Sequence, residues 1–177
     1  MKILGLDVAA STGVAYWDTR NSRSSIITAT LRTPGTKVTA EQRAYNFEDQ
    51  LTEFFRSPPM IINPDFVIIE QRPLNVYKGT HVNAALNTNL YVGAFIGIMA
   101  AMALPYQMVP VQTWRAAQYG AAQKGLDAKG KKALAKDLAE IEGIQCKNND
   151  EAEAAQLVQW GATSSIFAKQ AKMGEKS

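Results

Sequence analysis

The sequence contains almost no cysteine or histidine, and this scarcity excludes several kinds of site. Cys146 is the only cysteine and His81 the only histidine among 177 residues. One thiol cannot form a disulfide framework, and one thiol with one imidazole cannot build a Cys/His zinc site within one chain. Any metal bound by this chain is therefore expected to have oxygen ligands.

Long hydrophobic runs and targeting signals are also lacking. The longest apolar stretch, residues 90–104, is shorter than the roughly 20 residues that cross a bilayer, so we expect a core or interface helix and no membrane partner. Residues 1–7 reach an acid without the apolar region of a signal peptide and are typical of a strand. These absences predict an intracellular, cytoplasmic protein.

Low-complexity tracts and internal repeats are absent as well. With 46% hydrophobic and 20% charged residues, a chain of 177 residues can bury about two-thirds of its unfolded surface in one compact core. We predict a single domain over residues 1–168 and a polar C-terminal tail over residues 169–177.

The net charge of +3 is only mildly basic, but the basic residues are clustered. Residues 19–40 contain Arg and Lys without any acid, and residues 115–132 contain a second basic group in which Asp127 is the only acid. Such segments occur in solvated loops as well as on phosphate-binding surfaces, and both interpretations stay open on charge alone.

Apolar periodicity predicts the order βββαβαβαα, an α/β pattern with a mixed sheet. The expected strands are residues 3–7, 13–17, 25–31, 66–70 and 106–111, and the expected helices are residues 41–55, 83–104, 129–142 and 150–162. The first three strands are expected to be antiparallel. The apolar run of the fourth is typical of a strand buried on both faces. The 83–104 helix is apolar on nearly every side, so it is either fully buried or half of a dimer interface.

Two of the apolar strands end on an acid, Asp7 and Glu70, where such strands normally carry no charge. Each acid alone is compatible with a strand end that faces solvent or a neighbouring Lys. Two carboxylates roughly 4 Å apart repel each other by about 4 kcal/mol when the effective dielectric constant is about 20. A cluster would therefore need a compensating cation, for which bound Mg²⁺ or Mn²⁺ is the simplest explanation.

Further acids begin the last expected helix. Asp150 and Glu153 are three residues apart, so they share a helix face, and apolar residues on that face direct it toward the sheet. Asn148 or Asn149 is a natural N-cap, and Glu151 is expected to complete a capping box with Asn148. Capping accounts for Glu151 better than metal binding does, although Glu151 stays an alternative ligand.

Five short segments resemble, in order and spacing, the RuvC-like Holliday junction resolvases, especially divergent phage-type members. They are Leu4-Gly5-Leu6-Asp7, Ser11-Thr12-Gly13-Val14-Ala15, Val67-Ile68-Ile69-Glu70-Gln71, Val109-Pro110-Val111 and Asn149-Asp150-Glu151-Ala152-Glu153-Ala154. The resemblance covers nearly the whole chain. It implies the α/β RNase H-like fold of the retroviral integrase superfamily, with a central five-stranded mixed sheet flanked by helices, three strands being antiparallel and two parallel.

The resemblance also implies an activity, a Mg-dependent endodeoxyribonuclease that resolves Holliday junctions and other branched DNA in recombination and repair. The implied catalytic residues and metal ligands are Asp7, Glu70, Asp150 and Glu153. Two Mg²⁺ (or Mn²⁺) ions per site would serve a hydrolysis that leaves 5′-phosphate and 3′-hydroxyl ends. The implied setting is the cytoplasm of a bacterial or phage-infected host cell, and no nucleotide cofactor is expected.

A four-way junction has two-fold symmetry, so the resemblance implies a homodimer, with the 83–104 helix as the expected interface. Seven side chains are candidates for DNA contacts. Tyr77 is expected to stack on an unpaired base, or else to pack within its own loop. Arg72 and Lys78 are candidates beside Tyr77. The remaining four are expected to hold phosphates: Arg115, Lys129, Lys131 and Lys132.

Other functions fit parts of the sequence. Residues 7–15 also resemble the phosphate-loop hairpin of actin-like and sugar-kinase-like ATP-binding domains, but those proteins need two copies of the fold and a glycine-rich adenosine motif. A non-catalytic branched-DNA-binding subunit would have no need of four candidate ligands. A nuclease of the same fold that acts on RNA or single strands stays open, because metal ligands do not reveal the shape of the substrate.

Overall fold

The structure, a computed structural model, describes residues 1–9, 11–32, 38–56, 63–71 and 82–165. Its centre is a five-stranded sheet of β1 (Lys2–Asp7), β2 (Ser11–Asp18), β3 (Ile27–Arg32), β4 (Phe66–Gln71) and β5 (Tyr106–Pro110), in the order β3-β2-β1-β4-β5. β2 pairs antiparallel with β1 and β3, whereas β4 lies parallel to β1 and β5. The expected mixed sheet of three antiparallel and two parallel strands is confirmed.

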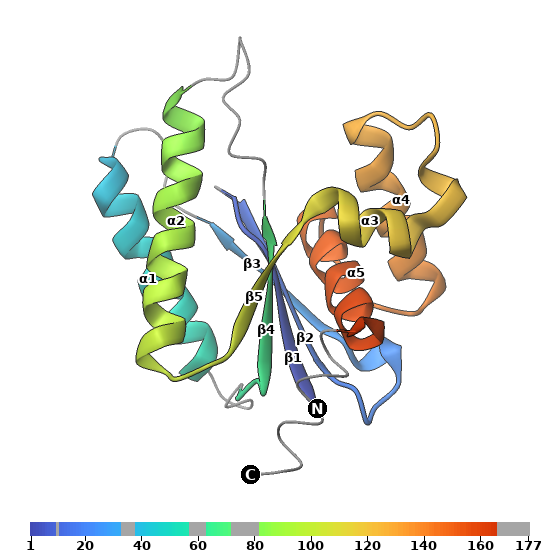
Figure 1. Ribbon diagram of the computed structural model, residues 1–177, viewed down its shortest axis with the longest axis horizontal. Helices are drawn as coiled ribbons and strands as arrows, with labels where there is room; N and C mark the ends of the chain where they lie inside the picture. Colours follow the sequence, from blue (N-terminus) through green and yellow to red (C-terminus); the bar gives the residue numbers. More distant parts are fainter. Residues whose placement is uncertain (10, 33–37, 57–62, 72–81, 166–177) are drawn as a thin grey trace.

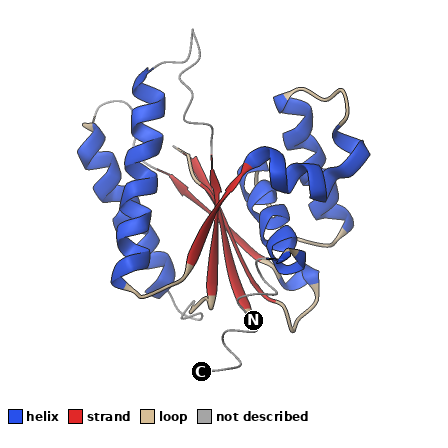
Figure 2. Ribbon diagram, in the orientation of Figure 1, coloured by secondary structure: helices blue, strands red, loops and turns tan. Residues whose placement is uncertain are grey.

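Helices cover both faces of this sheet (Figure 1). α1 (Ala40–Arg56) and α2 (Val82–Ala101) lie on one face, and α3 (Val111–Tyr119), α4 (Ala128–Ile141) and α5 (Asn149–Thr163) lie on the other. Figure 2 shows the resulting layers, with the strands between two groups of helices. Among the described residues, no helix combines the length and the apolar character that a membrane span requires.

Two elements differ from the sequence-based prediction. The third strand begins at Ile27, later than expected, because the preceding Arg23–Ser25 forms a short 3₁₀ helix. α3 was not predicted, and it begins at Val111, directly after β5, where the periodicity indicates the end of a strand. Trp114 and Tyr119 are the only buried residues of this short helix, which leaves little apolar periodicity to indicate it.

Side-chain alternation along the central strands divides the hydrophobic core in two. On β1, Ile3 packs with the core beneath α3, α4 and α5, whereas Leu4 and Leu6 pack with the core beneath α1 and α2. The side chains of β4 alternate in the same way. Because successive residues of a strand point to opposite faces, Asp7 and Glu70 both belong to the face that α5 covers.

α5 lies close to the sheet because small residues meet on both sides of the contact. Ala152, Ala154 and Ala155 are fully buried on the helix, and Gly13 of β2 lies beneath its first turn. A Cβ atom added to Gly13 would lie 1.9 Å from the backbone oxygen of Asp150, closer than real atoms approach. The absence of a side chain at residue 13 therefore sets how near the start of α5 comes to the sheet.

We expect Gly13→Ala to lower the free energy of unfolding by about 1–3 kcal/mol, the usual cost of forcing an extra methyl group into a packed contact. Urea unfolding followed by circular dichroism measures the change. Equal stability of Gly13→Ala and the unchanged protein would contradict the close contact.

Candidate active site

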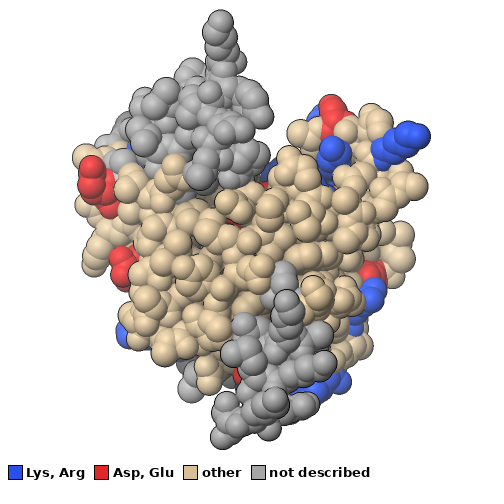
Figure 3. Space-filling model, in the orientation of Figure 1, with Lys and Arg blue, Asp and Glu red and all other residues tan. Residues whose placement is uncertain are grey.

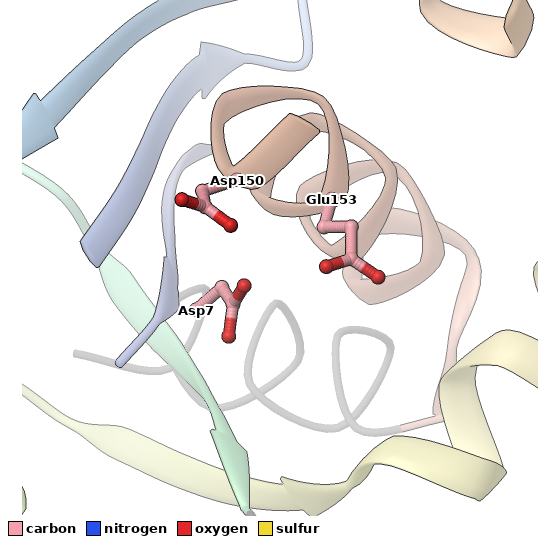
Figure 4. A group of neighbouring side chains, drawn as sticks. All are labelled: Asp7, Asp150 and Glu153. Atoms are coloured by element: carbon pink, nitrogen blue, oxygen red, sulfur yellow. The ribbon is translucent and has the colours of Figure 1, made fainter. Parts of the chain in front are cut away.

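Three carboxylates from two distant parts of the sequence meet at one end of the sheet. Asp7 ends β1, the middle strand, and Asp150 and Glu153 lie at the start of α5. One oxygen from each lies within 4.8 Å of the other two, and Figure 4 shows the three side chains gathered around a common centre. Asp7 and Glu153 are buried, and Asp150 is partly exposed. The helix face shared by Asp150 and Glu153 is therefore directed at Asp7, as the spacing predicts.

Glu70, the fourth candidate ligand, lies beside this three-carboxylate cluster on β4. Its side chain is buried, with 3% exposure. Its Oε2 accepts a hydrogen bond from Nε1 of Trp114 at 3.0 Å and lies 3.9 Å from Nη2 of Arg115. The Glu70 carboxylate is thus held by α3, and it is not one of the three whose oxygens converge.

Two cationic side chains lie among these carboxylates. Arg115 of α3 donates a hydrogen bond through Nη2 to Oε1 of Glu153. Nζ of Lys132, on α4, lies 2.6 Å from Oδ1 of Asp150 and 3.5 Å from Oε2 of Glu153. Among the described residues, Arg115 thus joins the acids of β4 and α5 to α3, and Lys132 joins the acids of α5 to α4.

Burial and neighbouring charges shift the pKa values of two groups in the cluster. Burial and then the charge of Asp7 raise the pKa of Glu153, and the two neighbouring cations only partly oppose the shift. Burial acts to lower the pKa of Lys132, but its hydrogen bond to Asp150 and the surrounding carboxylates raise it. Both groups therefore hold their protons more tightly than in water, Glu153 chiefly because it is buried and Lys132 because carboxylates surround it.

The donor set of the cluster fits a hard divalent cation. Asp7, Asp150 and Glu153 offer only carboxylate oxygens, and Glu70 lies next to them. Mg²⁺ and Mn²⁺ prefer oxygen ligands over sulfur or imidazole. A divalent ion bound there would also reduce the repulsion among the three converging carboxylates.

Glu151, the alternative ligand, is bound elsewhere. Its carboxylate accepts hydrogen bonds from Oγ1 of Thr30 at 2.7 Å, from Oγ1 of Thr28 at 3.0 Å and from the backbone N–H of Lys147 at 2.8 Å. Asn148 caps α5 as expected, because its Oδ1 accepts from the N–H of Glu151 at 3.0 Å. The predicted capping box is wrong in its second half, since Glu151 binds Lys147 and β3 and not the N–H of Asn148.

The hydrogen bonds of Glu151 orient the first turn of α5 relative to the cluster. They join the first turn of α5 to β3, an edge strand of the sheet, through a carboxylate that is only 2% exposed. The opposite side of the same turn then faces Asp7. Of the two acids that the sequence leaves as alternatives, the structure brings only Glu153 to the cluster.

The polar contact of Trp114 is not apparent from the sequence, which indicates only a core residue. Trp114 is indeed fully buried, but its indole N–H donates to Glu70 across 44 positions of the sequence. No local pattern indicates such a contact, because α3 was not predicted. A tryptophan at the end of an apolar strand, near the expected acids, was the one available signal.

The candidate DNA-binding residues are found in three situations. Arg115 and Lys132 lie within the acidic cluster. Lys129 is exposed and Lys131 half-buried in the first turn of α4. Figure 3 shows Lys and Arg side chains gathered over this side of the molecule. Three further candidates lie outside the described residues: Arg72, Tyr77 and Lys78.

The chain is similar to solved structures of Holliday junction resolvases. Thermus thermophilus RuvC in complex with a Holliday junction substrate superimposes with a TM-score of 0.70, at 14% sequence identity over 96% of this chain and 95% of that chain. A second structure of T. thermophilus RuvC gives a TM-score of 0.67 at 16% identity over 97% of both chains. The yeast mitochondrial resolvase Ydc2 gives 0.55 at 11% identity, over 97% of this chain and 85% of that chain.

No protein-family model matches the sequence, and no curated protein matches it. The sheet order and the helices on both faces define an α/β domain of the RNase H-like class. Within that class, the fold is the one found in RuvC-like Holliday junction resolvases, over nearly the whole chain. The resemblance drawn from five short segments is thereby confirmed at the level of the fold.

Proposed function

We propose that this protein is a metal-dependent endonuclease that cleaves branched DNA, with four-way junctions as its substrate. The observation that carries the proposal is the convergence of Asp7, Asp150 and Glu153 at the end of the middle strand. The fold adds support, because a protein of the same fold has been solved on a Holliday junction substrate. Converging carboxylates that can bind divalent ions are the setting in which metal-assisted phosphodiester hydrolysis operates.

Asp7, Glu70, Asp150 and Glu153 would hold two Mg²⁺ or Mn²⁺ ions, with Asp7 between the acid of β4 and the acids of α5. Bound there, the ions supply a water of lowered pKa and neutralise the charge that develops on the leaving 3′ oxygen. Hydrolysis adds water across the bond between phosphorus and that oxygen, giving a 5′-phosphate and a 3′-hydroxyl. Burial of Asp7 and Glu153 limits screening by solvent and strengthens their hold on cations.

The basic side chains divide by their distance from the cluster. Arg115 and Lys132 already contact its carboxylates, so they are placed to bind the phosphate that is cut. Lys129 and Lys131 lie at the start of α4 and would hold phosphates further along the strand, without reading the sequence. Arg72, Tyr77 and Lys78 remain proposals from the sequence, with Tyr77 as a stacking side chain.

We expect Asp7→Asn to reduce Mg²⁺-dependent cleavage of a synthetic four-way junction by about 10²–10³-fold or more, as loss of a group that stabilises the transition state does. The matched control is Asp137→Asn, an exposed acid on α4, which should leave the rate unchanged. The same assay is run on a fork, a linear duplex, a single strand and an RNA duplex. The ends of the products are identified on a sequencing gel.

Undiminished cleavage by Asp7→Asn would overturn the assigned site. Cleavage of only linear, single-stranded or RNA substrates would instead overturn the junction specificity and leave the metal-dependent chemistry in place. Junction binding without cleavage by the unchanged protein, in Mg²⁺ and in Mn²⁺, would indicate a non-catalytic branched-DNA-binding subunit.

The double variant Lys129→Ala/Lys131→Ala should weaken junction binding for every sequence and make it less sensitive to salt. The slope of log K against log[salt] is negative, and it should become shallower by about 0.9 for each phosphate that the variant no longer neutralises. Arg56→Ala is the control, because Arg56 is an exposed cation on α1, on the opposite face of the sheet. Fluorescence anisotropy in Ca²⁺ at several salt concentrations gives the slopes. Equal slopes for the double variant and the control would contradict the assigned phosphate-binding role.

We also propose a homodimer formed through α2, which would give a two-fold symmetric junction two active sites. Over residues 90–101 the exposed side of α2 has only apolar or small residues: Leu90 is 40% exposed, and Gly93 and Gly97 are exposed with open space beside them. Small residues at this spacing permit another helix to approach closely. α2 is therefore the surface most suited to a second copy of the chain.

Sedimentation velocity should find a dimer for the unchanged protein and a monomer for Leu90→Lys, because a charge placed in an apolar interface is costly to bury. Ile141→Lys is the matched control, since Ile141 is 81% exposed on α4, across the sheet. That variant should stay dimeric. A monomeric unchanged protein, or a dimer unaffected by Leu90→Lys, would exclude this interface.

A further inference from the structure

Trp114 has more polar and aromatic contacts than a core residue needs. It is fully buried in the first half of α3, and its Nε1 donates to Oε2 of Glu70 at 3.0 Å. Its ring meets the ring of Tyr119 edge-on, with centroids 5.4 Å apart and an interplanar angle of 75°. On another side, Cζ of Arg115 lies 5.3 Å from the centroid of the Trp114 ring.

These contacts fix the direction of the indole N–H. A tryptophan side chain has only two rotatable bonds and a single donor. Packing against Tyr119 restricts the ring, so the donor has one direction, and a carboxylate oxygen of Glu70 lies in it. A glutamate has three side-chain torsions, and a hydrogen bond from a rigid donor removes most of that freedom. Trp114 therefore restricts how the Glu70 carboxylate faces the cluster.

α3 also links the two halves of the site. Trp114 binds the acid of β4, and the next residue, Arg115, binds Glu153 of α5 and lies 3.9 Å from Glu70. The Arg115 guanidinium is placed beside the Trp114 ring, an arrangement that is attractive when the cation is partly desolvated. Arg115 is 17% exposed, so desolvation applies here. A single turn of α3 thus contacts both the strand-borne and the helix-borne acids.

We propose that Trp114 is a positioning residue of the metal site, which acts by holding the Glu70 carboxylate in the orientation that binds the cation. This inference rests on the proposed function, in which Glu70 is a metal ligand. It goes beyond that function because Trp114 touches neither metal nor DNA. Groups that orient a metal ligand commonly contribute about 10–100-fold to metal affinity, as their removal shows.

The test is a double-mutant cycle on the full chain, with Mn²⁺ binding measured by isothermal titration calorimetry in the absence of DNA. Trp114→Phe keeps an aromatic ring and removes the N–H, and we expect it to weaken Mn²⁺ binding by about 10-fold or more. Glu70→Gln should also weaken binding. When Glu70→Gln is already present, Trp114→Phe should have no further effect, because its effect is transmitted through Glu70.

Trp17→Phe is the matched control for the smaller side-chain volume. Trp17 is 9% exposed in the same core, and its Nε1 donates to the backbone oxygen of Asn21 at 3.2 Å, away from the acids. We expect this variant to be less stable in urea and to bind Mn²⁺ as tightly as the unchanged protein. If Trp114→Phe does not fold, a benzothienylalanine at position 114, in which sulfur replaces the N–H, keeps the size of the ring and tests the same donor.

The outcomes separate this inference from the function on which it rests. If Glu70→Gln weakens Mn²⁺ binding and removal of the Trp114 N–H does not, the positioning role is overturned and the metal site stands. If removal of the N–H weakens binding equally with and without Glu70→Gln, Trp114 does not act through Glu70, and the inference is again overturned. If Glu70→Gln leaves Mn²⁺ affinity unchanged, both the role of Glu70 as a ligand and the inference fail.

Discussion

Repulsion between carboxylates is the constraint around which this fold is organised. Oxygens of Asp7, Asp150 and Glu153 lie within 4.8 Å of one another, in a place that excludes most water. Like charges at that separation cost several kcal/mol unless cations or structure oppose them, by the estimate of about 4 kcal/mol per pair at roughly 4 Å. Burial and then the charge of Asp7 raise the pKa of Glu153. A cluster of this kind survives only if the surrounding elements hold the acids in place and supply positive charge.

Each helix on the face of the sheet that carries the acids opposes this repulsion, either by its packing or by a cationic side chain. α5 approaches closely over Gly13, and Glu151 joins its first turn to Thr28 and Thr30 of β3. α3 and α4 each bring one cation into the cluster. The packing of α5 and these ion pairs act together, because the close contact that brings the helix acids to β1 also brings them within reach of the cations. The proposed metal ions would reduce the repulsion among the converging carboxylates further.

Strands and helices with a long, regular pattern of apolar residues could be predicted from the sequence, and those with a short pattern could not. β1 and β4 were predicted because a short continuous apolar run is typical of a strand buried on both faces. Side-chain alternation along the two strands puts Asp7 and Glu70 on the same face of the sheet. α3 was not predicted because it is short and has two buried residues. That omission concealed the contact between Trp114 and Glu70. The capping box at Glu151 was predicted from local spacing and is half wrong, because two threonines of β3 bind the carboxylate instead.

The sequence by itself determined which atoms are available: carboxylates at the ends of apolar strands, two acids on one face of a helix, and no sulfur or imidazole set to compete with them. Strand and helix periodicity are local properties, so they can be read from neighbouring residues. Only the tertiary structure brought Glu153 and not Glu151 to the cluster, joined Glu70 to Trp114, and placed Arg115 among the acids. Those outcomes depend on contacts between residues that are 38 to 123 positions apart, which the packing of α3 and α5 on the sheet creates and no local pattern encodes.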